Sequence, residues 1–202
     1  MKKAKNALLL ALCAVLLVGA TIAGTLAFLT DTDEVKNTFT VGKIDITLDE
    51  AKVDEYGAEI ADADRVTENE YKLIPGKTYV KDPEIHVSAN SEDSYLFVKI
   101  TSNIDAYINA TDIEDQLDQN GWTKLEGNAD VWYQSYTKTD LAKDVKVFDT
   151  FTVLNNANNV ADWDKIAPAT SKIEIVAYAI QSEETGDASE AWAKLSNQFG
   201  MQ

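Results

Sequence analysis

Residues 95–101 read YLFVKIT, and this stretch decides the fold class. Its leucine, valine and isoleucine alternate on one side of an extended chain, while its tyrosine and phenylalanine lie on the other. Large apolar groups on both sides predict a central strand whose two faces are covered by other parts of the protein. We therefore expect a sheet that packs on both faces.

Further strand-like segments lie on both sides of this stretch and are separated by turn residues. A change of alternation at Gly42 predicts a bulge or corner in the first of them. Only two short helices are expected, one over residues 112–120 behind a capping box at Thr111 and one opened by Asp187. This pattern indicates an all-β, antiparallel sandwich. The other expected strands lie in residues 39–48, 78–87, 122–125, 131–136, 145–154 and 172–180.

The composition is that of a globular, acidic protein. The chain has 202 residues, 45% hydrophobic and 26% charged, with a net charge of −16. So much negative charge repels nucleic acid and anionic membranes. The single cysteine, Cys13, lies in the middle of an apolar run, so neither lipidation, nor a disulfide, nor a thiolate site is expected.

The first residues have the layout of an export signal. Lysines near the start precede residues 7–23, which are almost wholly apolar. Thr25 and Ala27 then stand at the two small positions of a cleavage site, which predicts a helical signal peptide over residues 1–27 and Phe28 as the mature N-terminus. The apolar run to residue 29 is also long enough to span a bilayer, so an uncleaved anchor remains the alternative.

The chain after the predicted cut divides into two parts. Residues 28–37 are polar and show no clear period, which predicts a flexible N-terminal arm. Residues 38–202 carry the strand patterns and are expected to form the β-sandwich domain. Within it, residues 50–70 are acidic and poor in large apolar residues, which predicts a surface loop.

A family resemblance covers the first half of the chain. Residues 24–46 read GTLAFLTDTDEVKNTFTVGKIDI, and residues 73–77, 81–83 and 95–99 read LIPGK, KDP and YLFVK. These segments resemble the TasA/camelysin (CalY) family of Gram-positive bacteria, whose signal peptides are cut by a SipW-type signal peptidase. The resemblance extends from residue 1 to about residue 100.

The resemblance implies a jelly-roll-like sandwich that is secreted, or held at the cell surface, and assembles into biofilm matrix or surface fibres. The implied partners are other copies of the chain, other matrix proteins and the signal peptidase during export. The membrane is contacted only through the signal segment, and no nucleic acid is expected. In this family the mature N-terminus of one subunit adds as a strand to its neighbour, and the matching donor-strand residues here are Phe28, Leu29, Val35, Phe39 and Val41.

Camelysin relatives are also labelled metallo-endopeptidases, so a peptidase is one alternative function. His86 is the only histidine, no H-E-x-x-H motif is present, and alternation with Ile85 and Val87 predicts that His86 lies on the polar face of a strand. No catalytic residue, metal ligand or cofactor is therefore assigned, and no enzyme is expected. A monomeric adhesin is the second alternative, although at least three of the four tryptophans are expected to fill the core.

Overall fold

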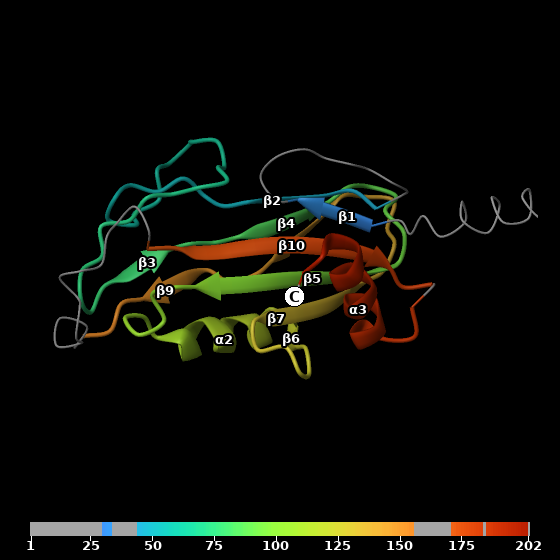
Figure 1. The fold of residues 1–202 in the computed structure, drawn as a ribbon. Coiled ribbons are helices and arrows are strands. Elements are labelled where there is room, and N and C mark those ends of the chain that lie inside the picture. The colour runs from blue at the N-terminus through green and yellow to red at the C-terminus, as the bar shows by residue number, and fades with distance from the viewer. Residues whose placement is uncertain (1–29, 34–43, 156–170, 184, 202) are drawn as a thin grey trace, which may run out of the picture.

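The computed structural model describes residues 30–33, 44–155, 171–183 and 185–201 (Figure 1). Within these residues the chain is mostly β, with two helices, as the sequence patterns predict. The elements, in order, are β1 (Thr30–Asp33), β2 (Ile46–Asp49), β3 (Thr78–Val80), β4 (Glu84–Val87), β5 (Ser94–Ser102), α2 (Ala110–Gln119), β6 (Thr123–Lys124), β7 (Val131–Tyr136), β8 (Lys143–Lys146), β9 (Thr150–Thr152), β10 (Ile173–Gln181) and α3 (Ala188–Phe199). Neither of these two helices has the length and apolar character needed to cross a membrane.

All strand pairings among the described residues are antiparallel. The largest sheet has the order β1-β10-β5-β7-β6, and smaller sheets have the orders β2-β4-β8 and β3-β9. The segment 95–101 lies in β5, at the centre of the largest sheet. It pairs with β10 on one side and β7 on the other, which confirms the prediction of a central strand.

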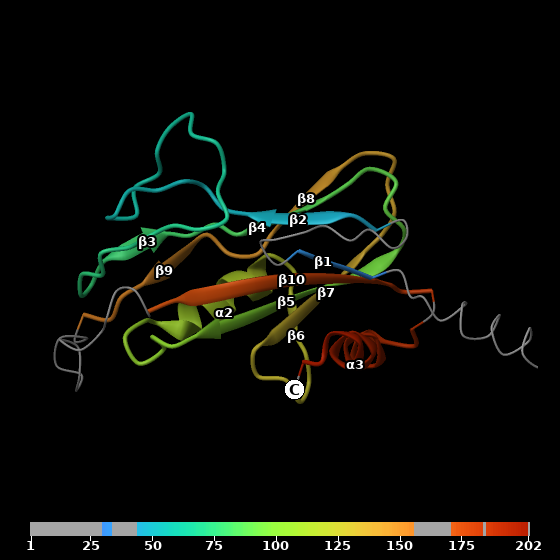
Figure 2. The ribbon, with the colours of Figure 1, turned by 45° about the horizontal axis from the view of Figure 1, so that its top comes forward.

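The main core lies between the five-stranded and three-stranded sheets, which form two layers in Figure 2. Leu96 and Val98 of β5 belong to the same buried cluster as Ile85 and Val87 of β4, and all four are 0% exposed. Burying such side chains against each other is the main favourable contribution to folding. The alternation read from the sequence thus selects the face of each strand that points into this core.

A second core covers the opposite face of the five-stranded sheet. Phe97 of β5 and Tyr178 of β10 lie on this face and pack against Trp192 of α3, with ring centroids 5.3 and 5.6 Å apart. The helix begins where the sequence predicts, because the Asp187 side chain accepts a hydrogen bond from the Glu190 amide. It ends at Gly200 in the left-handed conformation.

Two local predictions differ from the structure. α2 begins at Ala110 with Asn109 as its N-cap, so the prediction of a capping box at Thr111 is wrong. The Asn109 side chain instead donates to Asp112 in the first turn, at 2.5 Å. The segment 145–154 is not one strand but contributes to β8 and β9, in different sheets, because Val147 and Phe148 turn fully into the core between them.

The tryptophan prediction is confirmed for the described residues. Trp122, Trp132 and Trp192 are at most 7% exposed, while Trp163 lies outside the described part of the chain. The Trp122 indole also donates to the Lys146 carbonyl oxygen at 2.8 Å, so its one polar atom is satisfied. These side chains are therefore core residues and not a glycan-binding row.

Candidate functional site

The structure brings a segment near the start of the chain next to a strand near its end. β1, which falls within the predicted arm 28–37, pairs with β10 so that Thr30 lies opposite Ile180 and Asp33 opposite Ala177. The two strands lie side by side in Figures 1 and 2. These four arm residues are therefore an edge strand of the five-stranded sheet in this conformation.

The other predicted site residues lie outside the described part of the chain. This holds for the signal-cleavage positions and for the donor-strand positions, so both assignments stay predictions. The residues concerned are Thr25, Ala27, Phe28, Leu29, Val35, Phe39 and Val41.

One backbone edge of β10 can pair with an arm, while its other edge and both of its faces are held by the rest of the domain. Its far edge pairs with β5 over its full length, from Ile173 to Gln181. Ala177 and Ala179 point into the main core and are 0% exposed. β1 covers only the residues from 177 to 180, and no other described strand pairs with residues 173–176 on that edge. Among the described residues, the β1 pairing thus accounts for only part of this edge of β10.

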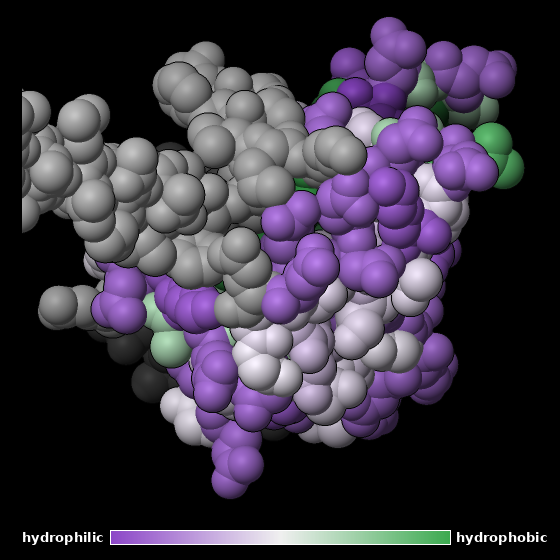
Figure 3. Space-filling view, turned by 90° about the vertical axis from the view of Figure 1, so that its right-hand side faces the viewer, coloured by the Kyte–Doolittle hydropathy of each residue, from purple (hydrophilic) through white to green (hydrophobic). Residues whose placement is uncertain are grey.

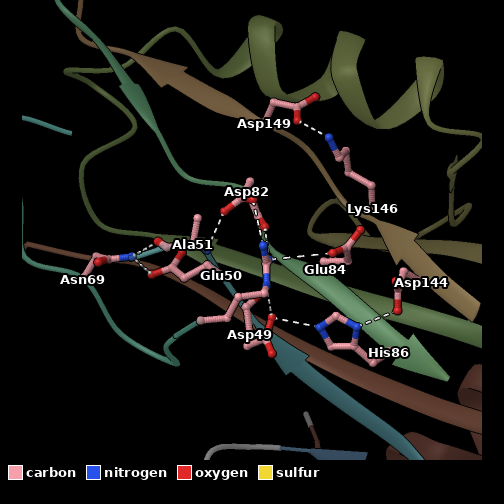
Figure 4. A network of polar contacts seen from close by, with 11 residues as sticks. Asp49, Glu50, Ala51, Asn69, Asp82, Glu84, His86, Asp144, Lys146 and Asp149 are labelled. Atoms are coloured by element: carbon pink, nitrogen blue, oxygen red, sulfur yellow. Dashed lines mark hydrogen bonds and ion pairs between the residues drawn. The ribbon is translucent and has the colours of Figure 1, made fainter. Parts of the chain in front are cut away.

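A second group of polar residues lies on the outer face of the β2-β4-β8 sheet (Figure 4). On β4 the buried Ile85 and Val87 alternate with Glu84 and His86, which therefore point outward. This placement confirms that His86 lies on the polar face of a strand. We call the group the His86 network; its members are Asp49, Arg65, Asp82, Glu84, His86 and Asp144.

His86 contacts one carboxylate through each ring nitrogen. Nδ1 lies 2.7 Å from Asp144 Oδ1 on β8, and Nε2 lies 2.9 Å from Asp49 Oδ1 on β2. An ionised carboxylate only accepts hydrogen bonds, so both bonds form together only when the imidazole is protonated. The ring therefore ties the three strands of this sheet together as an imidazolium.

Arg65 connects this sheet to the long connection between β2 and β3. Its guanidinium donates to the Asp49 and Asp82 carboxylates and to both backbone carbonyl oxygens of those residues. Burial alone would lower the pKa of Arg65, but these carboxylate partners outweigh it and raise the pKa. Arg65 thus stays charged and holds the segment between β2 and β3 against β2.

The residues next in sequence to the two carboxylates that bind Arg65 form an ion pair that is almost fully buried. Lys81 Nζ is 2.7 Å from Glu50 Oε2, and the two side chains are 10% and 5% exposed. Asn69 Nδ2 donates to the other Glu50 carboxylate oxygen at 3.0 Å. The predicted acidic surface loop is therefore anchored through its first carboxylate, which is not on the surface.

The surroundings of His86 determine its protonation. Burial alone would lower the pKa of His86, but the hydrogen bonds to Asp144 and Asp49, together with their negative charges, raise the pKa above its ordinary value. A raised folded-state pKa adds stability that is complete below the unfolded pKa of about 6.5 and is lost as the pH rises through the folded pKa.

We expect His86→Gln to destabilise the protein at about pH 5.5 more than at about pH 9, because only the protonated ring stabilises the fold through both carboxylates. For a partly exposed, solvent-screened group the difference should be about 0.5–1 kcal/mol. Urea unfolding at both pH values measures it. Glu114→Gln is the control, because it removes the carboxylate that pairs with Lys124 at an exposed position. A His86→Gln effect of the same size at both pH values would contradict the assignment.

Sequence reasoning placed His86 correctly but missed its partners. Asp49 and Asp144 are 37 and 58 residues away along the chain, and only the strand register brings them beside the ring. One signal was present in the sequence: Arg65 is its only arginine and stands inside an acidic segment. A planar guanidinium among carboxylates is typical of a multidentate contact.

Comparisons with protein-family models, with curated proteins and with solved structures found no match. The resemblance to the TasA/camelysin family therefore stays a prediction from the quoted motifs.

Proposed function

We propose that this protein is a secreted structural subunit of extracellular biofilm matrix or surface fibres. Subunits join when the mature N-terminal arm of one adds as a strand to the β10 edge of the next. The observation that carries the proposal is the antiparallel pairing of β1 with β10. That pairing supplies a backbone edge with a defined register, which is what strand addition requires.

The register gives the proposed contact a specific form. Antiparallel continuation of the β1–β10 pairing along the open part of the edge sets Val35 of a neighbouring arm opposite Ile175. An intramolecular arm competes with an intermolecular one through its high effective concentration. Release of the arm by cleavage, together with a high local concentration of subunits, lets a neighbour's arm replace the chain's own arm on β10.

The described part of one face shows no broad apolar interface, which supports joining through backbone pairing. On the face shown in Figure 3, most of the described residues are hydrophilic and the hydrophobic ones do not form a large patch. The net charge of −16 adds long-range repulsion between copies. Main-chain hydrogen bonds at one edge then provide both the attraction and the direction of growth.

The proposal includes the finer fold and the export route. The two layers of antiparallel strands support a jelly-roll-like sandwich. Residues 1–27 are proposed to be a signal peptide, which a SipW-type signal peptidase of a Gram-positive bacterium cuts after Ala27. Cleavage releases the arm at Phe28, so assembly takes place outside the cell or on its surface. Other matrix proteins with an open strand edge are possible partners for the same arm.

We expect protein that begins at Phe28 to form ordered filaments, and to form them faster as salt is added or as the pH is lowered. Salt screens the repulsion between acidic subunits. Acid neutralises surface carboxylates and so lowers the same repulsion. Electron microscopy, light scattering and N-terminal sequencing check this prediction.

Two outcomes would oppose the proposal. Cleaved protein that stays monomeric at high concentration, low pH and high salt would exclude self-assembly and favour a monomeric adhesin. Casein cleavage that a chelator abolishes would favour a metallo-endopeptidase instead. The uncleaved chain is the matched control, because its arm is tethered to the signal segment.

A further inference from the structure

Three side chains on the outer face of the β2-β4-β8 sheet converge on one point. Glu84 and His86 project from β4, and Asp144 projects from β8 directly opposite His86. One ligand atom from each residue lies within 4.8 Å of the others. In Figure 4 the His86 ring points to Asp144 on one side, with Glu84 on the same outward face.

The donor set indicates the class of ion. One imidazole nitrogen and two carboxylate oxygens suit zinc and similar divalent transition metals, whereas calcium and magnesium prefer oxygen ligands alone. The Asp144 side chain is 63% exposed and can adjust to an ion, whereas the His86 ring is held by Asp49. The backbone positions do not need to move, since paired strands fix them.

The second ring nitrogen has the partner that a metal-bound histidine requires. Nε2 lies 2.9 Å from Asp49 Oδ1, and Asp49 is held in turn by Arg65. A histidine that binds metal through one nitrogen usually donates its other N–H to a carboxylate, which fixes the tautomer and the ring orientation. With the proton on Nε2, the lone pair of Nδ1 faces Asp144.

We propose that Glu84, His86 and Asp144 bind a divalent transition metal ion such as Zn²⁺, with Nδ1 of His86 and one oxygen of each carboxylate as ligands. The ion takes the place of the proton that Nδ1 shares with Asp144. Asp49 is a positioning residue that holds the ring through Nε2. The site is one of binding, and no peptide cleavage is inferred from it.

The neighbouring cations are already engaged by other carboxylates. Lys146, opposite Glu84 on β8, contacts Asp149 at 2.5 Å. Arg65 lies 4.0 Å from Glu84 but is bound mainly to Asp49 and Asp82. Their positive charges reduce the affinity for a dication without blocking the three ligand atoms.

The test uses the full-length chain without a histidine tag, kept in mild detergent because of its apolar N-terminal run. His86 is the only histidine, so nitrogen-detected NMR of the imidazole reports on this site alone. Titration with Zn²⁺ should shift the Nδ1 resonance and leave Nε2 protonated, and calorimetry should show one bound ion. An imidazole spectrum unchanged by millimolar Zn²⁺ would overturn the proposal.

Variants separate ligation from general attraction to acidic surface. His86→Gln and Asp144→Asn should each weaken Zn²⁺ binding by about 100-fold or more, and Asp49→Asn by about 10-fold with a changed tautomer signal. Glu114→Gln removes one negative charge from α2, at a side chain that pairs with Lys124 and is not among the proposed ligands, and should have no effect. Equal binding by His86→Gln and the unaltered chain would show that Zn²⁺ binds elsewhere. The site lies on β4 and β8, so this result is independent of assembly at β10.

Discussion

Replacing Lys81 with methionine is expected to lower the free energy of unfolding by about 3–5 kcal/mol, the cost typical of breaking one side of a buried ion pair. Glu50, 5% exposed, would keep its hydrogen bond from Asn69 but lose its only described cationic partner. A methionine fills similar volume, so the effect reports on charge and not on a cavity. Urea unfolding of the two proteins measures the change, provided that the dependence of the unfolding free energy on urea concentration has the same slope in both.

Two further variants show whether the charge is responsible. Glu50→Gln combined with Lys81→Met removes both charges and should recover most of the lost stability, since replacing a whole buried pair is often nearly neutral. Lys124→Met breaks a similar pair with Glu114 at a site where the side chains are 43% and 49% exposed, and should cost less than about 1 kcal/mol. If Lys81→Met costs no more than Lys124→Met, the buried pair does not stabilise the fold.

The strand faces could be predicted because they depend on local alternation. Leu96 and Val98 point into the main core and Phe97 points to the opposite face, which is also covered, as the alternation in residues 95–101 indicates. The start of α3 was likewise readable, because a cap is made by residues three positions apart. The start of α2 was placed two residues late because Asn109 and Thr111 are both favoured N-cap residues with an acidic residue three positions on, and the sequence does not choose between them.

The candidate sites could not be predicted in the same way, because they are made by pairing between distant segments. The four residues of β1 read TDTD, a polar sequence with no strand pattern of its own. Their extended conformation follows from backbone pairing with β10, which adds hydrogen bonds whatever the side chains are. The His86 network has the same origin, since the register between β2, β4 and β8 sets its geometry.

Deleting residues 28–37 is expected to abolish filament formation by the secreted protein while leaving the subunit folded. β10 would keep its pairing with β5 from Ile173 to Gln181 and its packing on both faces, so the five-stranded sheet keeps its central strands when the β1 pairing is lost. Electron microscopy measures the loss of filaments. The NMR signal of His86, on the other sheet, checks that the fold is intact.

A synthetic peptide of residues 28–37 should then bind the shortened protein in a one-to-one complex, because it restores the strand that β10 lacks. Fluorescence anisotropy of the labelled peptide measures binding. A peptide with Asp31→Pro and Thr32→Pro is the matched control: adjacent amides of a strand point to opposite sides, so one proline must remove a bond to β10. Filaments formed by the shortened protein would show that the arm is not the donor. If the shortened protein is folded but does not bind the peptide, β10 is not the acceptor. The two results therefore test the donor strand and the acceptor strand separately.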